Sequence, residues 1–428
     1  MAPAHRKPDR RAGDEGSDTV NRGSLSAGER IELRRRRLGL SRRVVAQLVG
    51  RSEEWLRQVE QSHTQLDSIR LTYRLAEVLQ LNDPMELVGW PSAERSPATI
   101  DLQFAPLRRV VLDHPSTRAL TPEILKALPS PALLRASLQE CRTIWVNSSH
   151  RYTDLAVRLP DVLVAARSIR AAAQAAPDGP VEEAGALLVD AYHLARFLLT
   201  HVGDHHLAAI VADRPIGIFA RTAQPALVAL SSWHVASAML SLGYHAESRD
   251  YALAAARRFA SESPSDRSDK ALYGALQLIA AEGAAGAGDL TRSQDLIADA
   301  RDIAEKFDRV PADRKVWFGN TEVAITEMNI ALRLGKLDDV IELVAKVDIS
   351  DIDPVDLRVR YYITAAYAYC LCGADFPAIF ALQQAEQACP DDIRYDRMAH
   401  HTLQRLARRD HHLARKNLAK LLEVSGLA

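Results

Sequence analysis

The chain has 428 residues, a formal net charge of −1 at pH 7, 47% hydrophobic residues and only 6% aromatic residues. It is too long for one ordinary domain, and its near-neutral charge excludes a protein that coats nucleic acid along its whole length. The sequence contains no uninterrupted run of about 18 apolar residues, the length that could span a membrane. The charged N-terminus lacks the apolar core of a signal peptide. We therefore expect a cytoplasmic protein of several domains, rich in alanine and leucine, in which helices dominate.

Residues 1–23 form the first distinct segment. Arginine, aspartate, glycine and proline are frequent there, and apolar residues are almost absent. Such a composition cannot bury enough apolar surface to fold, so we predict a disordered tail. A basic arm that enters the minor groove of DNA is the alternative, although four acidic residues are interspersed with the cations.

The stretch from residue 41 to residue 60 predicts two short helices joined by a tight turn. Three apolar residues share one face of the first helix, and Gly50 follows at a position that favours a positive φ. Ser52 can cap a second helix, and Leu56 and Val59 of that helix can pack against the first. The exposed face of the second helix would carry Glu53, Glu54, Arg57 and Gln58.

Capping and charge patterns extend this helix pair into a domain over residues 24–89. Ser26 with Glu29 predicts a capping box that opens a first helix, and two later aspartates begin a fourth and a fifth helix. Residues 24–82 contain 11 arginines against 7 acidic residues, so this part is basic while the rest of the chain is acidic. A basic module on a slightly acidic body is typical of a DNA-binding domain attached to a sensing or assembly domain.

These residues resemble the helix-turn-helix domain of the Cro/phage-repressor (XRE) family, which has a five-helix, lambda-repressor-like fold. The matching positions, in register, are Leu40-Ser41, Val45-Ala46, Gly50, Ser52, Leu56, Val59-Glu60 and Leu75-Ala76. The resemblance implies that the second helix of the pair reads base edges of double-stranded DNA. The positions that it implies for DNA contact are Arg42, Arg43, Ser52, Glu53, Glu54, Arg57, Gln58, Gln61 and His63.

Glu53 and Glu54 depart from the polar uncharged residues that this family usually carries there. Carboxylates repel phosphate, and their natural base partner is the amino group of cytosine. Two interpretations stay open: the pair reads cytosine, or it stabilises the N-terminus of the helix through the helix dipole. Arg42 stands where the family usually has glutamine, but a cation at this position can contact phosphate equally well.

Prolines concentrate between residues 90 and 130, where they interrupt long helices, so we predict a linker over this segment. From residue 131 to residue 428 the chain repeats itself. Five glycines follow alanine-rich apolar segments at intervals of 40, 45, 47 and 38 residues, which are periods of α-solenoids, and we predict TPR-like helical hairpins. The glycines are Gly203, Gly243, Gly288, Gly335 and Gly373, with small residues at Ala236, Ala281 and Ala366 before them and at Ala255, Ala300 and Ala385 after them.

The whole arrangement resembles a group of actinobacterial XRE-type regulators that carry a C-terminal TPR-like region. The resemblance is carried by GRSEEWLRQVE at 50–60, RYTDLAVRLPDVL at 151–163, WFGNTEVAI at 317–325 and GADFPAIFALQQAEQACPDDIRYDR at 373–397. It implies an all-α protein whose TPR-like region mediates dimerisation and holds an effector in a concave groove. In the TPR register, the groove-facing positions are Asp190, His193, Phe197, Trp233, Glu322, Ile325, Asn329, Arg333, Arg360, Ile363 and Tyr367.

Asn329 and Arg333 lie one helical turn apart in this register. Together they could grip a peptide backbone and a carboxylate, respectively. The alternative for each single position is a solvated helix face.

The leading hypothesis is a transcriptional regulator that binds double-stranded DNA, on a palindromic operator, as a homodimer and responds to a peptide, small-molecule or protein effector. The alternative is a TPR-type interaction scaffold whose degenerate first domain docks a partner protein. No phosphate loop, nucleophile elbow or HExxH motif is present, so we expect no catalytic residue, metal or cofactor. The four cysteines are expected to be buried thiols.

Overall fold

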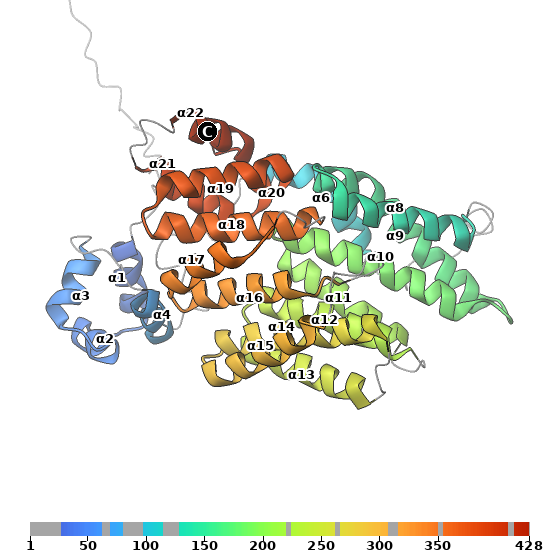
Figure 1. Cartoon of the computed structure of the whole chain (residues 1–428), viewed down its shortest axis with the longest axis horizontal. Helices are drawn as coiled ribbons and strands as arrows, with labels where there is room; N and C mark the ends of the chain where they lie inside the picture. The colour runs from blue at the N-terminus through green and yellow to red at the C-terminus, as the bar shows by residue number, and fades with distance from the viewer. Residues whose placement is uncertain are drawn as a thin grey trace, which may run out of the picture. The chain divides into compact units, whose positions relative to one another are not determined.

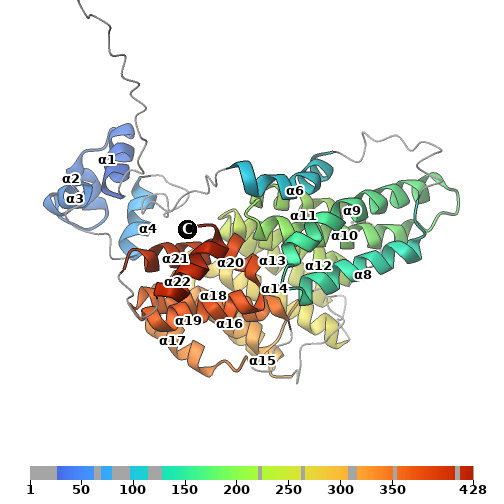
Figure 2. The same ribbon diagram turned by 90° about the horizontal axis from the view of Figure 1, so that it is seen from above.

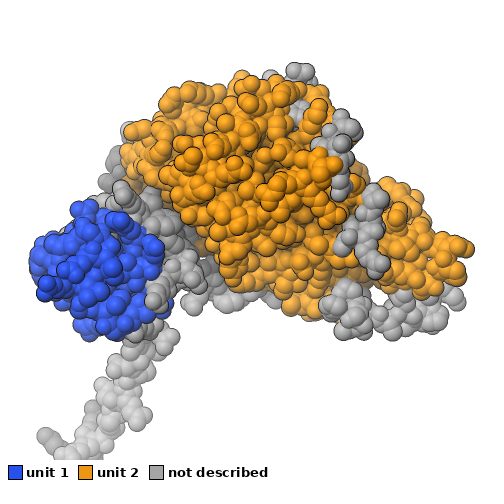
Figure 3. All heavy atoms as spheres, turned by 90° about the horizontal axis from the view of Figure 1, so that it is seen from below, with its two compact units in different colours: residues 1–92 blue, residues 93–428 orange. Residues whose placement is uncertain are grey.

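The computed structural model describes residues 27–61, 69–79, 97–113, 128–219, 224–261, 266–306, 316–349, 354–409 and 415–427. Contacts divide the chain into two compact units, residues 1–92 and residues 93–428, which Figure 3 colours separately. All regular structure within these described ranges is helical, which confirms the all-α class. No helix in the described ranges is long and apolar enough to cross a membrane.

The first unit is built around one small apolar core. Val45, Leu56 and Leu75 come from three different helices and are fully buried in it. The predicted tail, the predicted fifth helix and His63 lie outside the described residues. The helices described in this unit are α1 (Ala27–Arg37), α2 (Arg42–Leu48), α3 (Glu53–Glu60) and α4 (Ile69–Val78).

The connection between α2 and α3 has the geometry that the sequence predicts. Gly50 has a φ of 70°, in the left-handed region that favours glycine. The Oγ of Ser52 accepts a hydrogen bond from the amide of Trp55 at 3.1 Å, and Ser41 caps α2 in the same way. These caps satisfy amides that have no partner inside the helix, and so they fix where each helix begins.

The second unit is a series of antiparallel helical hairpins (Figures 1 and 2). It opens with α6 (Pro97–Leu112), α8 (Pro131–Asn147) and α9 (Arg151–Ala175). The repeats follow as α10 (Val181–His201) with α11 (His205–Phe219), α12 (Pro225–Ser241) with α13 (His245–Ser261), α14 (Arg267–Gly286) with α15 (Leu290–Ala304), α16 (Asn320–Arg333) with α17 (Leu337–Lys346), and α18 (Val355–Leu371) with α19 (Asp375–Ala388). The last helices are α20 (Pro390–Tyr395), α21 (Arg397–Ala407) and α22 (Arg415–Ser425).

The five repeat glycines lie at the turns of these hairpins, with φ values between 70° and 86°. The alanines that precede them by seven residues are fully buried, as helices that approach closely require. Two of these alanines also accept hydrogen bonds: the Oγ of Ser248 donates to the carbonyl of Ala236 at 2.8 Å, and the Oγ of Ser293 donates to that of Ala281 at 2.9 Å. These two hairpins therefore share a hydrogen bond as well as a turn glycine.

The predicted linker over residues 90–130 requires a correction, because α6 lies within it. Phe104, Leu107 and Val111 of α6 are fully buried in the core of the second unit. Burying three such side chains contributes roughly 1.5–3 kcal/mol each, which exceeds the cost of about 3 kcal/mol for the proline inside this helix. That residue, Pro106, lies on the exposed side of α6.

The first and last hairpins of the second unit share one core. Residues of α8 to α11 and residues of α18 to α22 belong to the same cluster of buried apolar side chains. Phe104 of α6 contacts Tyr395 of α20 edge to face, with ring centroids 5.5 Å apart. The sequence suggests a superhelix with a concave groove. In the structure, the last hairpin packs against the first one.

Candidate nucleic-acid interface and interior pockets

The N-terminal half of α3 presents a polar, solvent-accessible face. Ser52, Glu53, Glu54 and Gln61 are exposed, and Arg57 and Gln58 are half-exposed. On the neighbouring α2, Arg43 is exposed. These residues, which were expected to face DNA, are thus accessible, and their contacts with DNA stay predictions.

Glu54 and Arg57 form a bidentate ion pair on this face. Arg57 donates from Nη2 to one carboxylate oxygen of Glu54 at 2.5 Å and from Nε to the other at 2.7 Å. These hydrogen bonds hold the pKa of Glu54 below its ordinary value and raise the pKa of Arg57. Gln58 donates to Glu54 at 3.2 Å, and Gln61 accepts from Arg57 at 2.5 Å. Four expected reading residues therefore form one connected cluster.

Glu60 is a buried carboxylate that the sequence analysis did not single out. It lies at the end of α3 and accepts hydrogen bonds from Arg35 at 2.5 and 3.0 Å and from Arg42 at 2.6 Å. Burial alone would raise the pKa of Glu60, but the hydrogen bonds from the two arginines outweigh it and the pKa is lowered. The sequence signals were its match to the family pattern as part of Val59-Glu60 and its place in register with apolar positions, which a buried ion pair explains.

Arg42 forms ion pairs within the unit, and its contact with phosphate stays a prediction. Its Nε binds Glu60, and its Nη2 lies 3.5 Å from Glu32 of α1. The side chain thus joins α1, α2 and α3, and it is only half-exposed. Arg43, the next residue, is the exposed cation of this pair.

The arginine run at the end of α1 has structural contacts as well. Nε of Arg34 donates to the carbonyl of Leu79 at 3.0 Å, and Arg36 pairs with Glu32 at 2.6 Å. The Arg34 contact and the buried Arg35 tie the end of α1 to the rest of the unit, whereas the Arg36–Glu32 pair lies within α1.

In the second unit, the expected groove residues divide into separate groups. His193, Phe197 and Trp233 belong to a largely buried aromatic cluster, in which the rings of His193 and His234 stack at 3.9 Å. Arg196 lies in the same cluster, 5.0 Å above the ring of Trp233, and burial lowers its pKa to about 9.

Arg196 occupies the position seven residues before the repeat glycine, where three of the other four repeats carry a buried alanine and the fourth carries Met328. A large cation therefore replaces a small residue in the first repeat.

A second group surrounds a fully buried arginine that the sequence analysis missed. Arg151 of α9 donates two hydrogen bonds of 2.8 Å to Asp392 of α20 and one of 3.1 Å to Asp356 of α18. Arg360 of α18 binds Glu322 of α16 at 2.8 Å and extends this network. Burial would raise the pKa of Asp356, but the charges of Arg151 and Arg360 hold it below its usual range.

Asn329 and Arg333 have different neighbours, and their joint grip on a peptide stays a prediction. The Oδ1 of Asn329 lies 3.4 Å from the hydroxyl of Thr364, whereas the guanidinium of Arg333 lies 3.3 Å from the imidazole of His245 at the start of α13. Tyr367 is farther along α18, where its ring contacts His401.

Two further expected groove positions, Ile325 and Ile363, are corrected to core positions. They are buried with 0% and 4% of their surface exposed, so most of each side chain packs between helices.

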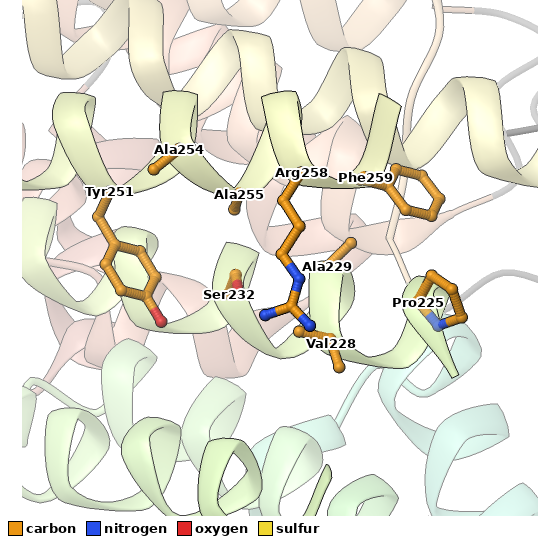
Figure 4. Close-up of a pocket in the computed structure, with 9 residues that line it drawn as sticks. All are labelled: Pro225, Val228, Ala229, Ser232, Tyr251, Ala254, Ala255, Arg258 and Phe259. Carbon is orange, nitrogen blue, oxygen red and sulfur yellow. The ribbon is translucent and has the colours of Figure 1, made fainter. Parts of the chain in front are cut away.

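The described part of the second unit contains several concavities. One, of about 60 Å³, is lined by Asp190, His193 and Phe197 together with residues of α8 and α18. Another, of about 200 Å³, lies between α12 and α13, and Figure 4 shows Arg258 extending from α13 across it toward Ala229 and Ser232. A third, of about 270 Å³, borders the Arg151 network through Asp392 and Arg360.

The described part of the chain contains no candidate metal site. No group of three or more His, Cys, Asp or Glu side chains is placed there to hold an ion. Three of the four thiols are buried, and Cys372 is exposed, against the expectation for that residue.

Comparison with known proteins agrees with the geometry of the first unit. Residues 26–87 match the sequence model of the family described as "Helix-turn-helix domain". This match and the capped α2–α3 pair establish that the chain carries a helix-turn-helix domain, the DNA-reading module of many transcriptional regulators.

Among solved structures, the chain is similar to Bacillus thuringiensis PlcR in complex with the peptide PapR7 and DNA. The identity is 9%, the alignment covers 75% of this chain and 92% of that chain, and the TM-score is 0.33. No curated protein matches the sequence.

Proposed function

We propose that this protein is a sequence-specific transcriptional regulator of the XRE type, in the group found in actinobacteria, and that α3 reads double-stranded DNA. The observation that carries the proposal is the Ser52-capped α3, which follows α2 after a glycine turn and keeps its polar face exposed. A helix held in this way can enter the major groove while its neighbour contacts the backbone.

The Glu54–Arg57 pair defines what this face could read. Arginine binds the O6 and N7 atoms of guanine, and a carboxylate accepts a hydrogen bond from the N4 amino group of cytosine. Arg57 and Glu54 already lie side by side, so they could contact the two bases of one G·C pair. The mutual ion pair must then open, which replaces its two hydrogen bonds with hydrogen bonds to bases.

One reading helix of this size contacts only a few base pairs. We infer that the protein acts as a homodimer on a palindromic operator, with half-sites about one helical turn or a multiple apart. The second unit would hold the two copies and bind a peptide, small-molecule or protein effector. In this role the protein is cytoplasmic, and it associates with the nucleoid when bound to DNA.

The decisive experiment selects bound sequences from a random duplex library with the full chain and with Arg57→Ala. We expect the variant to lose preference at one G·C position of each half-site and to bind its best site about 10–100-fold more weakly, since a bidentate base contact contributes roughly 1–3 kcal/mol of discrimination. Arg74→Ala is the matched control, because it removes an exposed arginine from α4. An unchanged selected motif with Arg57→Ala would contradict direct reading by α3.

The scaffold function is a second candidate, and the neutralised Glu54–Arg57 face favours it, since an arginine paired within the protein attracts phosphate less. A salt titration with random duplex separates the two functions. Several phosphate contacts give a steep loss of affinity between about 50 and 200 mM salt. No binding even at low salt would favour the docking function.

A further inference from the structure

The donor groups with which Arg57 would bind a base are already engaged within α3. Nε and Nη2 of Arg57 form one edge of the guanidinium, and both donate to the carboxylate of Glu54, at 2.7 and 2.5 Å. Nη1 donates to the side-chain oxygen of Gln61 at 2.5 Å. A bidentate contact with guanine needs two adjacent N–H groups of the arginine. A base must therefore compete with Glu54 and Gln61 for these donors.

Glu53 lies one residue earlier and does not share this arrangement. Both carboxylates are exposed in the first turn of α3. Arg57 forms its ion pair with Glu54, and no ion pair between described residues involves Glu53. The two residues thus carry the same charge at the same end of the helix and differ in their contact with Arg57. An effect of charge alone should be common to both, whereas an effect of pairing should belong to Glu54.

Two energetic effects decide what Glu54 does when α3 enters the major groove. An exposed ion pair contributes at most about fivefold to an equilibrium, so opening the pair with Arg57 costs little. A carboxylate that loses its water in the groove and finds no donor there lowers the affinity by about 10–100-fold. The second effect is the larger one. Glu54 therefore matters most at DNA sites that leave it without a donor.

The two side chains together match the hydrogen-bonding pattern of one base pair. Across the major groove, a G·C pair presents the N7 and O6 acceptors of guanine, followed by the N4 amino donor of cytosine. An A·T pair instead presents its donor between two acceptors. Two N–H groups of Arg57 beside an acceptor on Glu54 fit the first pattern, in one orientation of the G·C pair.

We propose that Glu54 excludes incorrect DNA sequences: it holds Arg57 in an ion pair on random sequence, and it permits α3 to bind in the groove only where a cytosine amino group replaces Arg57 as its hydrogen-bond donor. This inference rests on the proposed function and deepens it. Most of the discrimination then comes from the penalty at wrong base pairs and less from attraction at the right one.

Sensitivity to a methyl group on the cytosine amino nitrogen is a direct consequence. N4-methylcytosine uses its one remaining N–H to pair with guanine, so it has no second N–H for Glu54. The guanine contacts of Arg57 are unchanged in such a base pair. This modified base therefore separates the effect of Glu54 from that of Arg57.

The test uses the full chain and the base pair whose preference Arg57→Ala removes in the selection experiment. In one half-site of the best selected duplex, the cytosine of that pair is replaced by N4-methylcytosine. The Kd of each duplex is measured by fluorescence anisotropy at one fixed salt concentration. We expect the methyl group to weaken binding by the unaltered chain about 10–100-fold, because Glu54 is left without a donor.

Glu54→Ala and Glu53→Ala form a charge-matched pair of variants. With Glu54→Ala, the two duplexes should bind within about twofold of each other, since no carboxylate remains to lose its donor. Glu53→Ala should keep the sensitivity of the unaltered chain to the methyl group. Random duplex should bind at least about threefold more tightly to Glu54→Ala than to Glu53→Ala, with a salt slope steeper by about 1, because Arg57 is then available to phosphate.

Four outcomes would overturn the inference: the unaltered chain binds both duplexes equally, Glu54→Ala keeps the sensitivity to the methyl group, Glu53→Ala loses it, or both variants bind random duplex equally. Failure of the proposed function looks different, because then no sequence is selected or the selected motif does not depend on Arg57, and this inference fails with it. A motif that depends on Arg57 but not on the methyl group removes this inference alone.

Discussion

Glu60 accepts three hydrogen bonds from two arginines in a buried position, so its charge holds α1, α2 and α3 together. We predict that Glu60→Gln destabilises the first unit by about 3 kcal/mol at pH 7, since it leaves Arg35 buried without its counterion. Hydrogen exchange of the α1–α3 amides in the full chain, followed by mass spectrometry, measures the effect in this unit alone.

The pH dependence of this effect has a definite sign. The folded pKa of Glu60 lies below its unfolded value of about 4.3, so the stabilisation is present above that pH and is lost as the pH falls through the folded pKa. The variant and the parent should therefore converge in acid. Glu53→Gln, which changes an exposed carboxylate on the same helix, should leave exchange almost unaltered. Equal protection in Glu60→Gln and the parent at pH 7 would show that the ion pair contributes nothing.

For single residues, the sequence predicts which side chains are exposed better than it predicts which side chains form ion pairs. The helical spacing of the apolar residues in α3 puts Arg57 and Gln58 on its outer face, because one periodicity fixes both faces of a helix. It does not reveal that Arg42 turns inward to Glu60. That contact depends on where α1 crosses α3, which no local pattern encodes.

In the element α14, Gly274 marks a close approach between a helix and an aromatic ring. A Cβ at this residue would lie 2.1 Å from Cζ of the fully buried Phe318. We predict that Gly274→Ala destabilises the second unit by about 1–3 kcal/mol, because the ring has to move inside a packed core. Urea unfolding of the full chain, followed by circular dichroism, measures the change.

A matched glycine in α11 provides the control. A Cβ on Gly217 would meet no atom within 4 Å, and this residue is exposed on its helix. Gly217→Ala should therefore stabilise the protein by up to about 1 kcal/mol through helix propensity. If both substitutions changed the free energy of unfolding in the same direction, the close contact with Phe318 would not be the cause.

The hairpins of the repeat series can be predicted from the sequence, because each turn between paired helices has a residue with positive φ, and glycine is favoured at that residue. The five glycines therefore reveal five hairpins. The helix α6 is missed for the opposite reason: prolines were interpreted as breaks, whereas the exposed Pro106 is tolerated by a helix that gains three buried side chains.

For the whole molecule, Arg151 is the contact that joins the beginning of the second unit to its end. We predict that Arg151→Met destabilises this unit by about 3–5 kcal/mol, because Asp356 and Asp392 then remain buried without their cation. Thermal unfolding should begin several degrees lower. Limited proteolysis should cut first between α19 and α22.

Arg158→Met is the matched control, because Arg158 lies on the same helix and, among the described residues, pairs with the exposed Glu140. A surface pair of this kind contributes about 0–1 kcal/mol. If both variants lost the same free energy of unfolding, the cause would be the loss of a positive charge on α9 and not the loss of the contact between the two ends of the second unit.

Closure was beyond sequence analysis because the residues involved are 205 and 241 positions apart in the chain. Periodicity describes how each hairpin packs on the next, and it contains nothing about how far the series curves. The sequence therefore assigned residues such as Ile325 to a groove, whereas the structure buries them in the core.

The separation of Arg151 from Asp392 also has a consequence for synthesis on the ribosome. Translation proceeds at about 5–20 residues per second, so the 241 residues between the two take on the order of tens of seconds to appear. During that time the helix-turn-helix unit has already emerged, while Arg151 has no Asp392 to bind. A nascent or prematurely terminated chain would therefore display a finished first unit on an unclosed second one, with apolar surface exposed to chaperones and proteases. The Arg151–Asp392 contact therefore forms only in chains whose last hairpin has been synthesised.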